Sequence, residues 1–409
     1  MATKQLPQFS PETLAWLARA NLKDRQSKGQ FMTPRVLRSH LLNQLHMKPG
    51  DRVLDPAVGT GEFLKDALEI EPGITVTGWD IDETIIEVAR ECVPKAHLVC
   101  RSALDEYDGE LFDLVIGNPP YFEMKLDQEQ KLRFQTILNG RPNIYSLFFR
   151  AGIDALKPGG TLAYVVPPSM NAGAYFKNLR KYLTSENHVL SLKVFEDPSM
   201  FVDAQTSVQI IVVKKGPGIS RHTFEISNTN PDFQSLIFCE DPQSFGEMYK
   251  GCVSLASLGY DATTGNTVWN QHKENLTNEL SSDSVPLLYA RNIVSGHIQL
   301  SEDDRRPQYI RTRRFLTGEA IVVNRIIGGV GKGQIKAAMV PEGYKFAAEN
   351  HLNVIRPIKG AKQLVDIASL FEMISSPEVI VKVRSITGNT QLSATEWTHV
   401  VPIRYPIHT

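Results

Sequence analysis

The run Asn118-Pro119-Pro120-Tyr121 brings together two groups that can hold a flat molecule carrying an amine. The carboxamide oxygen of Asn118 accepts hydrogen bonds from amino N–H groups, and the ring of Tyr121 offers a face for stacking. The two prolines lack an N–H, so they end any strand before them and make the turn rigid. A planar molecule with an exocyclic amine, such as adenine, suits this pair of groups. An ordinary turn after a strand is the alternative.

The residues before this run indicate which element positions it. Residues 111–116 are apolar, rich in β-branched side chains and bounded by turn residues, which predicts a buried strand. In an open α/β sheet, ligands bind beyond the carboxyl ends of the strands. Asn118 and Tyr121 are therefore expected at the ligand-binding edge of a sheet.

A second segment predicts what binds at that edge. Residues 52–55 read as a strand, 56–61 as a glycine-rich turn and 62–69 as a helix, which is the first unit of a doubly wound sheet. Asp55 ends this strand. Asp80 follows the next strand, 75–78, at about the spacing where an acid takes both hydroxyls of a ribose.

The glycine-rich turn does not have the form of a phosphate-binding loop. No Gly-Lys-Ser or Gly-Lys-Thr occurs, and no third glycine follows Gly59-Thr60-Gly61 to complete GxGxxG. Acids at two strand ends instead favour a ligand with a ribose and a positively charged amino group. S-adenosylmethionine has both and carries no phosphate, so we expect it as the cofactor.

The remaining chain completes an α/β domain and leaves a less regular C-terminal part. Further strands are expected at 98–100, 161–166, 189–195 and 207–213, with helices at 143–156 and 175–183 and a turn at 157–160. Seven strands with intervening helices make one domain, and Lys214 to Gly218 reads as its boundary. We therefore expect a catalytic domain at 1–218, a connector at 219–285, and a mixed α+β domain at 286–409.

Composition narrows the class of protein. The chain has 409 residues, which suits two domains. No apolar run approaches the roughly 20 residues that span a membrane, and no signal peptide is recognisable. The four cysteines form no CxxC pair and the ten histidines no HExxH pair. We therefore expect no metal site, no membrane association, and a bacterial cytoplasmic location.

Charge is distributed unevenly along the chain. Residues 286–409 hold 16 Lys and Arg against 10 Asp and Glu, a formal charge of +6, whereas the rest holds 28 against 35, a charge of −7. A basic C-terminal part fits a polyanionic partner. The arginines of this part that would contact phosphates are Arg291, Arg305, Arg306, Arg311, Arg313, Arg314 and Arg325, and a solvated basic face is the alternative.

Taken together, the motifs resemble a known family. The stretch from Asp55 to Leu64 followed by Asn118-Pro119-Pro120-Tyr121 is similar to amino-methyltransferases that use S-adenosylmethionine. The order, with Gln30-Phe31-Met32-Thr33-Pro34 first and a large C-terminal domain last, resembles the γ-class N6-adenine DNA methyltransferases of bacterial restriction–modification systems, of which the Taq DNA adenine methyltransferase is the familiar example. That resemblance implies a class I, Rossmann-like methyltransferase domain with a mostly parallel seven-stranded sheet, and a C-terminal domain that recognises DNA.

The resemblance also implies residue roles around the cofactor. Thr33 would lie at its methionine end, Asp55 and the backbone of Ala57 and Gly59 would line its amino acid and sugar, and Asp80 would hold the ribose. Ile81 and Phe148 would flank its adenine ring. Ser102 stands where the family usually has an acid that binds the cofactor's adenine amino group, with Asp105 three residues on.

For the target base, the resemblance implies that Asn118 and the Pro119 carbonyl accept hydrogen bonds from its amino group, with Pro120 completing the turn. Tyr121 and Phe201 would stack on the base after it is flipped out of duplex DNA. The product would be S-adenosylhomocysteine, and any restriction endonuclease partner would be a separate chain. Cytosine N4, an RNA base, a protein glutamine, and a non-catalytic DNA-recognition subunit stay open as alternatives.

Overall fold

The computed structural model describes residues 8–195, 207–226, 235–300, 306–325, 334–387 and 392–405. The chain divides into two compact units. Unit 1 holds residues 1–170, 175–223 and 238–240, and unit 2 holds residues 171–174, 224–237 and 241–409. Within the described ranges, no helix has the length and apolar character needed to cross a membrane.

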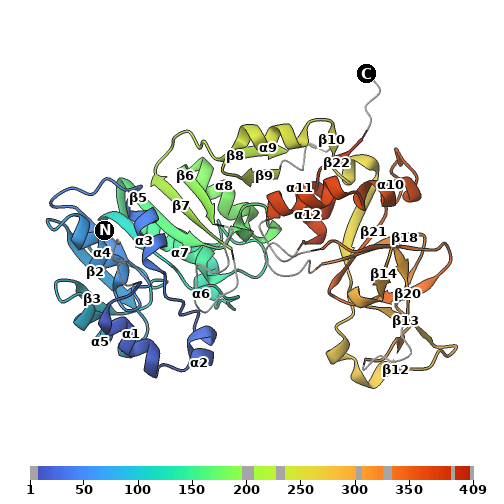
Figure 1. Cartoon of the computed structure of the whole chain (residues 1–409), viewed down its shortest axis with the longest axis horizontal. Coiled ribbons are helices and arrows are strands. Elements are labelled where there is room, and N and C mark those ends of the chain that lie inside the picture. The colour runs from blue at the N-terminus through green and yellow to red at the C-terminus, as the bar shows by residue number, and fades with distance from the viewer. Residues whose placement is uncertain are drawn as a thin grey trace, which may run out of the picture. The chain divides into compact units, whose positions relative to one another are not determined.

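Unit 1 is built on a seven-stranded sheet with the order β3-β2-β1-β4-β5-β7-β6 (Figure 1). Its strands are β1 (Arg52–Asp55), β2 (Thr75–Asp80), β3 (His97–Cys100), β4 (Phe112–Gly117), β5 (Leu156–Val166), β6 (Asn187–Phe195) and β7 (Val208–Lys215). The pairs from β3 to β5 are parallel, and β7 runs antiparallel to both β5 and β6. The mostly parallel seven-stranded sheet predicted from the sequence is confirmed.

Helices cover both faces of this sheet. Successive residues of β4 enter opposite cores: Val115 joins one, while Leu114 and Ile116 join the other. Phe112 joins the core of Val115, because the register of β4 shifts between Phe112 and Leu114. The first core is closed by α7 (Ile144–Ala155) and α8 (Lys177–Ser185), and the second by α3 (Arg35–Leu42), α4 (Glu62–Ile70) and α5 (Glu83–Cys92). Burial on both faces explains why the central strands read as continuous apolar runs.

The remaining helices of unit 1 are short and amphipathic or polar. They are α1 (Pro11–Arg19), α2 (Leu22–Ser27) and α6 (Gln128–Phe134). Ser10 caps α1: its side chain accepts a hydrogen bond from the Thr13 N–H, and Pro11 opens the first turn.

One local expectation was wrong. Residues 157–160 were expected as a turn before a strand starting at Thr161, but β5 already begins at Leu156. Phe112 pairs with Leu156, and the next pair joins Leu114 to Thr161, so the four residues between bulge out of the ladder. Because Pro158 has no N–H to donate, the chain accommodates it in this bulge.

Unit 2 contains short strands and helices. A four-stranded sheet has the order β11-β21-β18-β19 and a five-stranded sheet the order β12-β16-β13-β20-β17. The strands of the first are β11 (Tyr260–Thr264), β21 (Leu352–Pro357), β18 (Ala320–Asn324) and β19 (Ala337–Val340); those of the second are β12 (Leu276–Thr277), β16 (Tyr309–Arg311), β13 (Ser284–Leu288), β20 (Lys345–Ala348) and β17 (Leu316–Thr317). Helices α10 (Ile367–Ile374), α11 (Pro377–Thr387) and α12 (Ala394–His399) follow, and the buried Trp397 and Leu370 join the core of the first sheet.

Candidate cofactor and target-base site

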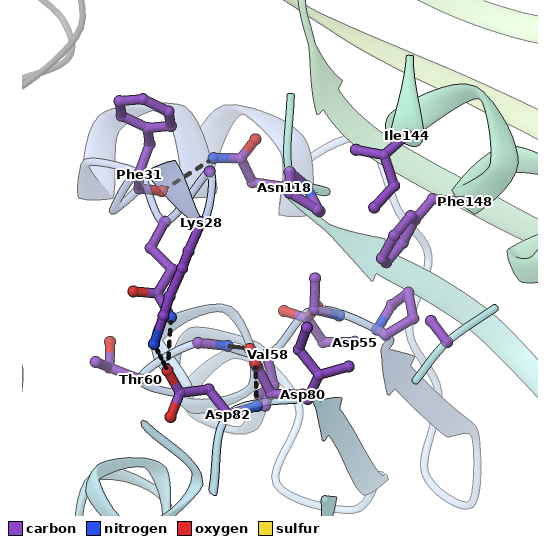
Figure 2. Close-up of a pocket in the computed structure, with 18 of the residues that line it drawn as sticks. Lys28, Phe31, Asp55, Val58, Thr60, Asp80, Asp82, Asn118, Ile144 and Phe148 are labelled. Atoms are coloured by element: carbon purple, nitrogen blue, oxygen red, sulfur yellow. Dashed lines mark hydrogen bonds and ion pairs between the residues drawn. The ribbon is translucent and has the colours of Figure 1, made fainter. Parts of the chain in front are cut away.

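A cavity of about 690 Å³ opens at the carboxyl ends of β1, β2 and β4. Segments 28–33, 55–60, 80–83 and 102–104 line it, together with Asn118, Pro120, Phe122, Met124, Ile144 and Phe148. Figure 2 shows the labelled side chains arranged around it, with Ile144 and Phe148 across from Lys28 and Phe31. The position agrees with the general rule for ligands of parallel sheets.

Asp55 is the most buried acid of the cavity, with 1% of its surface exposed. Its Oδ1 accepts a hydrogen bond of 3.0 Å from the Ala57 N–H. Gly117, at the end of β4, has φ +146°, and a Cβ there would lie 2.6 Å from Asp55 Oδ1. Glycine at this position therefore lets the two strand ends approach. Burial, reinforced by the charge of Asp80, raises the pKa of Asp55 to about 8 despite the hydrogen bond from Ala57.

Asp80 is fixed by backbone donors on both sides. Its Oδ2 accepts from the Gly59 N–H at 3.1 Å, and its Oδ1 accepts from the Asp82 N–H at 3.1 Å. Burial is the main reason that the pKa of Asp80 is raised above its ordinary value. A carboxylate oxygen has more than one lone pair, so both oxygens keep capacity for hydroxyl donors. Because ionising these two acids is costly, Asp55 and Asp80 make the cavity favourable for a positively charged ligand.

Apolar side chains form the opposite wall. Phe148 on α7 is buried and faces the cavity beside Ile144, whereas Ile81 is 76% exposed at its rim (Figure 2). Ser102 lines the cavity, and its Oγ accepts from the Leu104 N–H at 3.1 Å. Asp105 lies outside the lining residues. Ser102 therefore lines the cavity and Asp105 does not, and the contact of Ser102 with the cofactor's adenine stays a prediction.

Asn118 stands at the rim directly after β4. Its Nδ2 donates a hydrogen bond of 3.2 Å to the Phe31 carbonyl. Pro120 lines the cavity, whereas Pro119 is buried and Tyr121 half-buried, and neither is a lining residue.

Tyr121 packs beside Asn118. Its hydroxyl lies against Asn118 Oδ1 and 2.9 Å from the Val165 carbonyl oxygen. Burial raises the pKa of Tyr121 far above its ordinary value, so this hydroxyl stays protonated and acts as a donor. The ring lies nearly parallel to that of Phe31, at 6.5 Å between centroids and 15° between planes.

Thr33 lines the cavity, and its backbone is held by a buried network of charged side chains. Its carbonyl accepts from Arg38 Nη1 at 2.6 Å, and the same guanidinium pairs with Asp66 at 2.7 Å and Glu62 at 2.9 Å. The two acids belong to α4, the helix after the glycine-rich turn. The network therefore ties the segment before the cavity to that helix.

Several residues at the cavity had no role in the sequence analysis. Lys28, Gln30 and Asp82 form a polar cluster at one rim, with Lys28 Nζ 2.8 Å and Gln30 Nε2 3.3 Å from Asp82 Oδ2. The local feature that marks this cluster is the positive φ of Gly29, and a backbone angle cannot be recognised from the sequence. Phe201, predicted to stack on the target base, lies outside the described residues.

The predicted DNA-contacting arginines belong to unit 2, except that Arg305 lies outside the described residues. Arg291, Arg306, Arg311, Arg313 and Arg314 are exposed, and Arg325 is half-buried at the end of β18. The guanidinium of Arg291 lies 4.3 Å from the centroid of the Tyr289 ring, and that of Arg306 lies 5.0 Å from the centroid of the Trp269 ring. Arg311 is 3.9 Å from Asp283.

Comparison with known proteins shows similarity to methyltransferases of restriction–modification systems. Residues 75–201 match the family described as Eco57I restriction-modification methylase. The modification methylase CviBIII of Paramecium bursaria Chlorella virus NC1A is 25% identical over 344 residues, covering 82% of this chain and 84% of its own. The chain is similar to restriction–modification methyltransferases.

Two further relatives extend this similarity. The type II methyltransferase M.CvrRI of Paramecium bursaria Chlorella virus XZ-6E is 26% identical, covering 85% of this chain and 88% of its own. The type II methyltransferase M.BsuBI of Bacillus subtilis is 24% identical, covering 86% of this chain and 75% of its own. Among solved structures, the type IIG restriction endonuclease BpuSI aligns with a TM-score of 0.43 and 11% identity over 97% of this chain and 60% of its own.

The strand order of unit 1, with one reversed strand between β5 and β6, is that of class I S-adenosylmethionine-dependent methyltransferases. A cavity at the carboxyl ends of the first strands, the buried Asp55 and half-buried Asp80 within it and a carboxamide at its rim lie together in this fold. Such an arrangement can bind a cationic nucleoside and present an acceptor to an amino group beside it.

Proposed function

We propose that this protein is a site-specific DNA methyltransferase that transfers a methyl group from S-adenosylmethionine to N6 of a flipped-out adenine. The observation that carries the proposal is the position of Asn118, whose carboxamide stands at the rim of the cavity that holds Asp55 and Asp80. The similarity to restriction–modification methyltransferases supports DNA as the substrate and protection of host DNA as the purpose.

The residues of the cavity fit this methyl donor. Asp55 is buried and Asp80 half-buried, and burial is the main reason that the pKa of each is raised. S-adenosylmethionine supplies a sulfonium and an α-ammonium group, which stabilise both carboxylates. Asp80 would hold the ribose hydroxyls, Phe148 and Ile81 would flank the adenine ring, and Thr33 would lie near the methionine end. When bound, the donor supplies a methyl group on a good leaving group.

The contribution of the chain to the reaction is positioning. The lone pair of an adenine amino group is delocalised into the ring, so the nitrogen is a weak nucleophile. Acceptors on its two hydrogens, the Asn118 carboxamide oxygen and the Pro119 carbonyl, would favour a tetrahedral nitrogen and direct its lone pair at the methyl carbon. Tyr121 would turn its ring to the base, and stacking of roughly 1–3 kcal/mol offsets part of the unstacking cost.

Unit 2 would supply the contacts to duplex DNA. Its exposed arginines Arg291, Arg306, Arg311, Arg313 and Arg314 can neutralise phosphates without reading sequence. Adenine N6 rather than cytosine N4 is proposed because the motif order resembles the γ-class adenine enzymes.

The test is transfer of labelled methyl from S-adenosylmethionine to unmethylated genomic DNA, RNA and protein offered together. Wild-type protein is expected to label DNA as N6-methyladenine. Asn118→Ala should lose at least about 100-fold in rate, as expected for removal of one preorganised polar contact to the reacting group. The control is Asn43→Ala, the same change at an exposed residue of unit 1, which should keep the wild-type rate.

The other outcomes are equally informative. Label as N4-methylcytosine would change the target base, and label in RNA or protein would overturn DNA as the substrate. Cofactor binding without any transfer would favour a non-catalytic DNA-recognition subunit.

A further inference from the structure

The rotation of the Asn118 carboxamide decides whether the proposed reaction can occur. When Oδ1 points toward the target, the carboxamide accepts a hydrogen bond from the amino group. If the carboxamide were rotated by 180°, the N–H groups of Nδ2 would face the N–H groups of the target, and no hydrogen bond could form. A carbonyl oxygen only accepts, so the Phe31 carbonyl at 3.2 Å holds Nδ2 on its side and leaves Oδ1 directed elsewhere. The Phe31 carbonyl on Nδ2 (Figure 2) and the Tyr121 hydroxyl on Oδ1 therefore hold this amide in one orientation from its two ends.

Residues 29 and 31 are packed directly on the turn that carries Asn118. Gly29 has φ +69°, and a Cβ there would lie 2.9 Å from Pro120 Cβ and 3.3 Å from the Tyr121 nitrogen. The Phe31 ring stacks on Tyr121. Because position 29 has no side chain, residues 29–31 can pack closely against the turn.

The same short segment is anchored at the cofactor end of the cavity. Lys28 Nζ and Gln30 Nε2 both bind Asp82 Oδ2, at 2.8 and 3.3 Å. The N–H of Asp82 in turn binds Asp80 Oδ1, the proposed ribose ligand. The hydrogen bond from Lys28 is the main reason that the pKa of Asp82 is lowered to about 2. The Lys28–Asp82 pair is therefore ionised at neutral pH.

We propose that residues 28–31 are a positioning segment through which a bound cofactor fixes the orientation of the Asn118 amide. The proposal rests on the methyl-transfer function proposed above. An unbroken series of contacts runs from Asp80 through Asp82 to Lys28 and Gln30, and from Phe31 to Asn118. Because residues 28–33 all line the cavity, an occupant packs against the segment and restricts its movement. A bound methyl donor would then stabilise the alignment of the acceptor that these contacts already hold.

The first test measures the coupling without any substrate. Hydrogen–deuterium exchange is followed with and without S-adenosylhomocysteine in the wild type, Lys28→Met and Lys23→Met. Lys23 lies exposed on α2 and controls for loss of one lysine charge. S-adenosylhomocysteine should slow the exchange of segments 56–62, 28–33 and 121–126 in the wild type and in the Lys23→Met control. In Lys28→Met, 56–62 should stay protected while protection of 28–33 and 121–126 is largely lost. Equal protection of all three segments in Lys28→Met would overturn the proposal.

The second test separates positioning from cofactor affinity. Single-turnover methyl transfer to unmethylated genomic DNA is measured at saturating cofactor, alongside the cofactor dissociation constant. Lys28→Met should slow transfer about fivefold at saturation, the low end of typical coupling between sites, and Lys28→Arg should restore it. A higher dissociation constant with an unchanged saturated rate would show a plain binding contact and overturn the proposal.

Gly29→Ala tests the packing side of the same segment. It should lower the saturated rate about tenfold, whereas Gly50→Ala, also at positive φ but with no neighbour within 4 Å, should not. Equal rates for the two variants would contradict the role of Gly29. If wild-type protein transfers no methyl to DNA, the proposed function fails, while the exchange experiment still decides the role of the segment.

Discussion

Cofactor binding is predicted to release a proton from Asp55. Burial raises the pKa of this carboxyl to about 8, and the charge of Asp80 adds to the effect. A positive charge placed beside it stabilises the carboxylate and lowers that pKa. The empty protein therefore holds the proton at neutral pH, and the complex gives it up.

The magnitude follows from that pKa. A group with a pKa of about 8 is roughly nine-tenths protonated at pH 7, so about 0.9 proton leaves for each cofactor bound. Ionising the group at pH 7 costs about 1.4 kcal/mol. The dissociation constant should therefore fall about ninefold between pH 6 and pH 7, because binding releases protons. The raised pKa of Asp80 contributes in the same direction.

Isothermal titration calorimetry with S-adenosylmethionine measures both quantities. Titrations in two buffers of different ionisation enthalpy count the protons, and the dissociation constant is followed from about pH 5.5 to about pH 7. The ligand's α-amino group, with an ordinary pKa of about 7.7–8.0, stays protonated in this window. Asp55→Asn, which keeps the shape without the titrating proton, should flatten the pH dependence. A dissociation constant independent of pH in the wild type, or the same slope in Asp55→Asn, would refute the reasoning.

Three further changes test other parts of the structure. Gly117→Ala should destabilise the protein by about 1–3 kcal/mol in urea denaturation, because its Cβ would meet Asp55 Oδ1; an unchanged midpoint would contradict that close approach. Arg38→Met leaves Asp66 buried without its partner and should cost about 3–5 kcal/mol in the same assay, so a loss below 1 kcal/mol would argue against the buried network. Arg311→Ala should reduce the slope of log affinity for duplex DNA against log salt by about 1 in filter binding, and an unaltered slope would exclude a phosphate contact.

The central strands and their ends were predictable because the signals are local. Two apolar runs, Val53-Leu54 and Leu114 to Ile116, end at Asp55 and at Gly117-Asn118. Such runs predict buried strands directly, without knowledge of distant contacts. Parallel strands meet at one edge, so the side chains after them had to gather. Asp55, Asp80 and Asn118 accordingly line one cavity.

What could not be predicted depends on contacts between distant positions. The hydrogen bond from Asn118 to Phe31 joins residues 87 positions apart, and nothing in the polar stretch around Lys28 announces it. Around Pro158 the turn residues were recognised, but the pairing of Leu156 with Phe112 keeps them inside a strand. In unit 2, strands of two to six residues are too short to show a period.

The two acids at the ends of β1 and β2, Asp55 and Asp80, also bear on turnover. Methyl transfer converts a sulfonium into a neutral thioether, so one positive charge disappears from a cavity in which Asp55 and Asp80 are costly to ionise. We therefore expect the spent donor to be held less tightly than the fresh one, since burial penalises carboxylates that lose a compensating charge. Exchange of product for substrate is favoured by this loss of charge, and inhibition by accumulated S-adenosylhomocysteine is weakened.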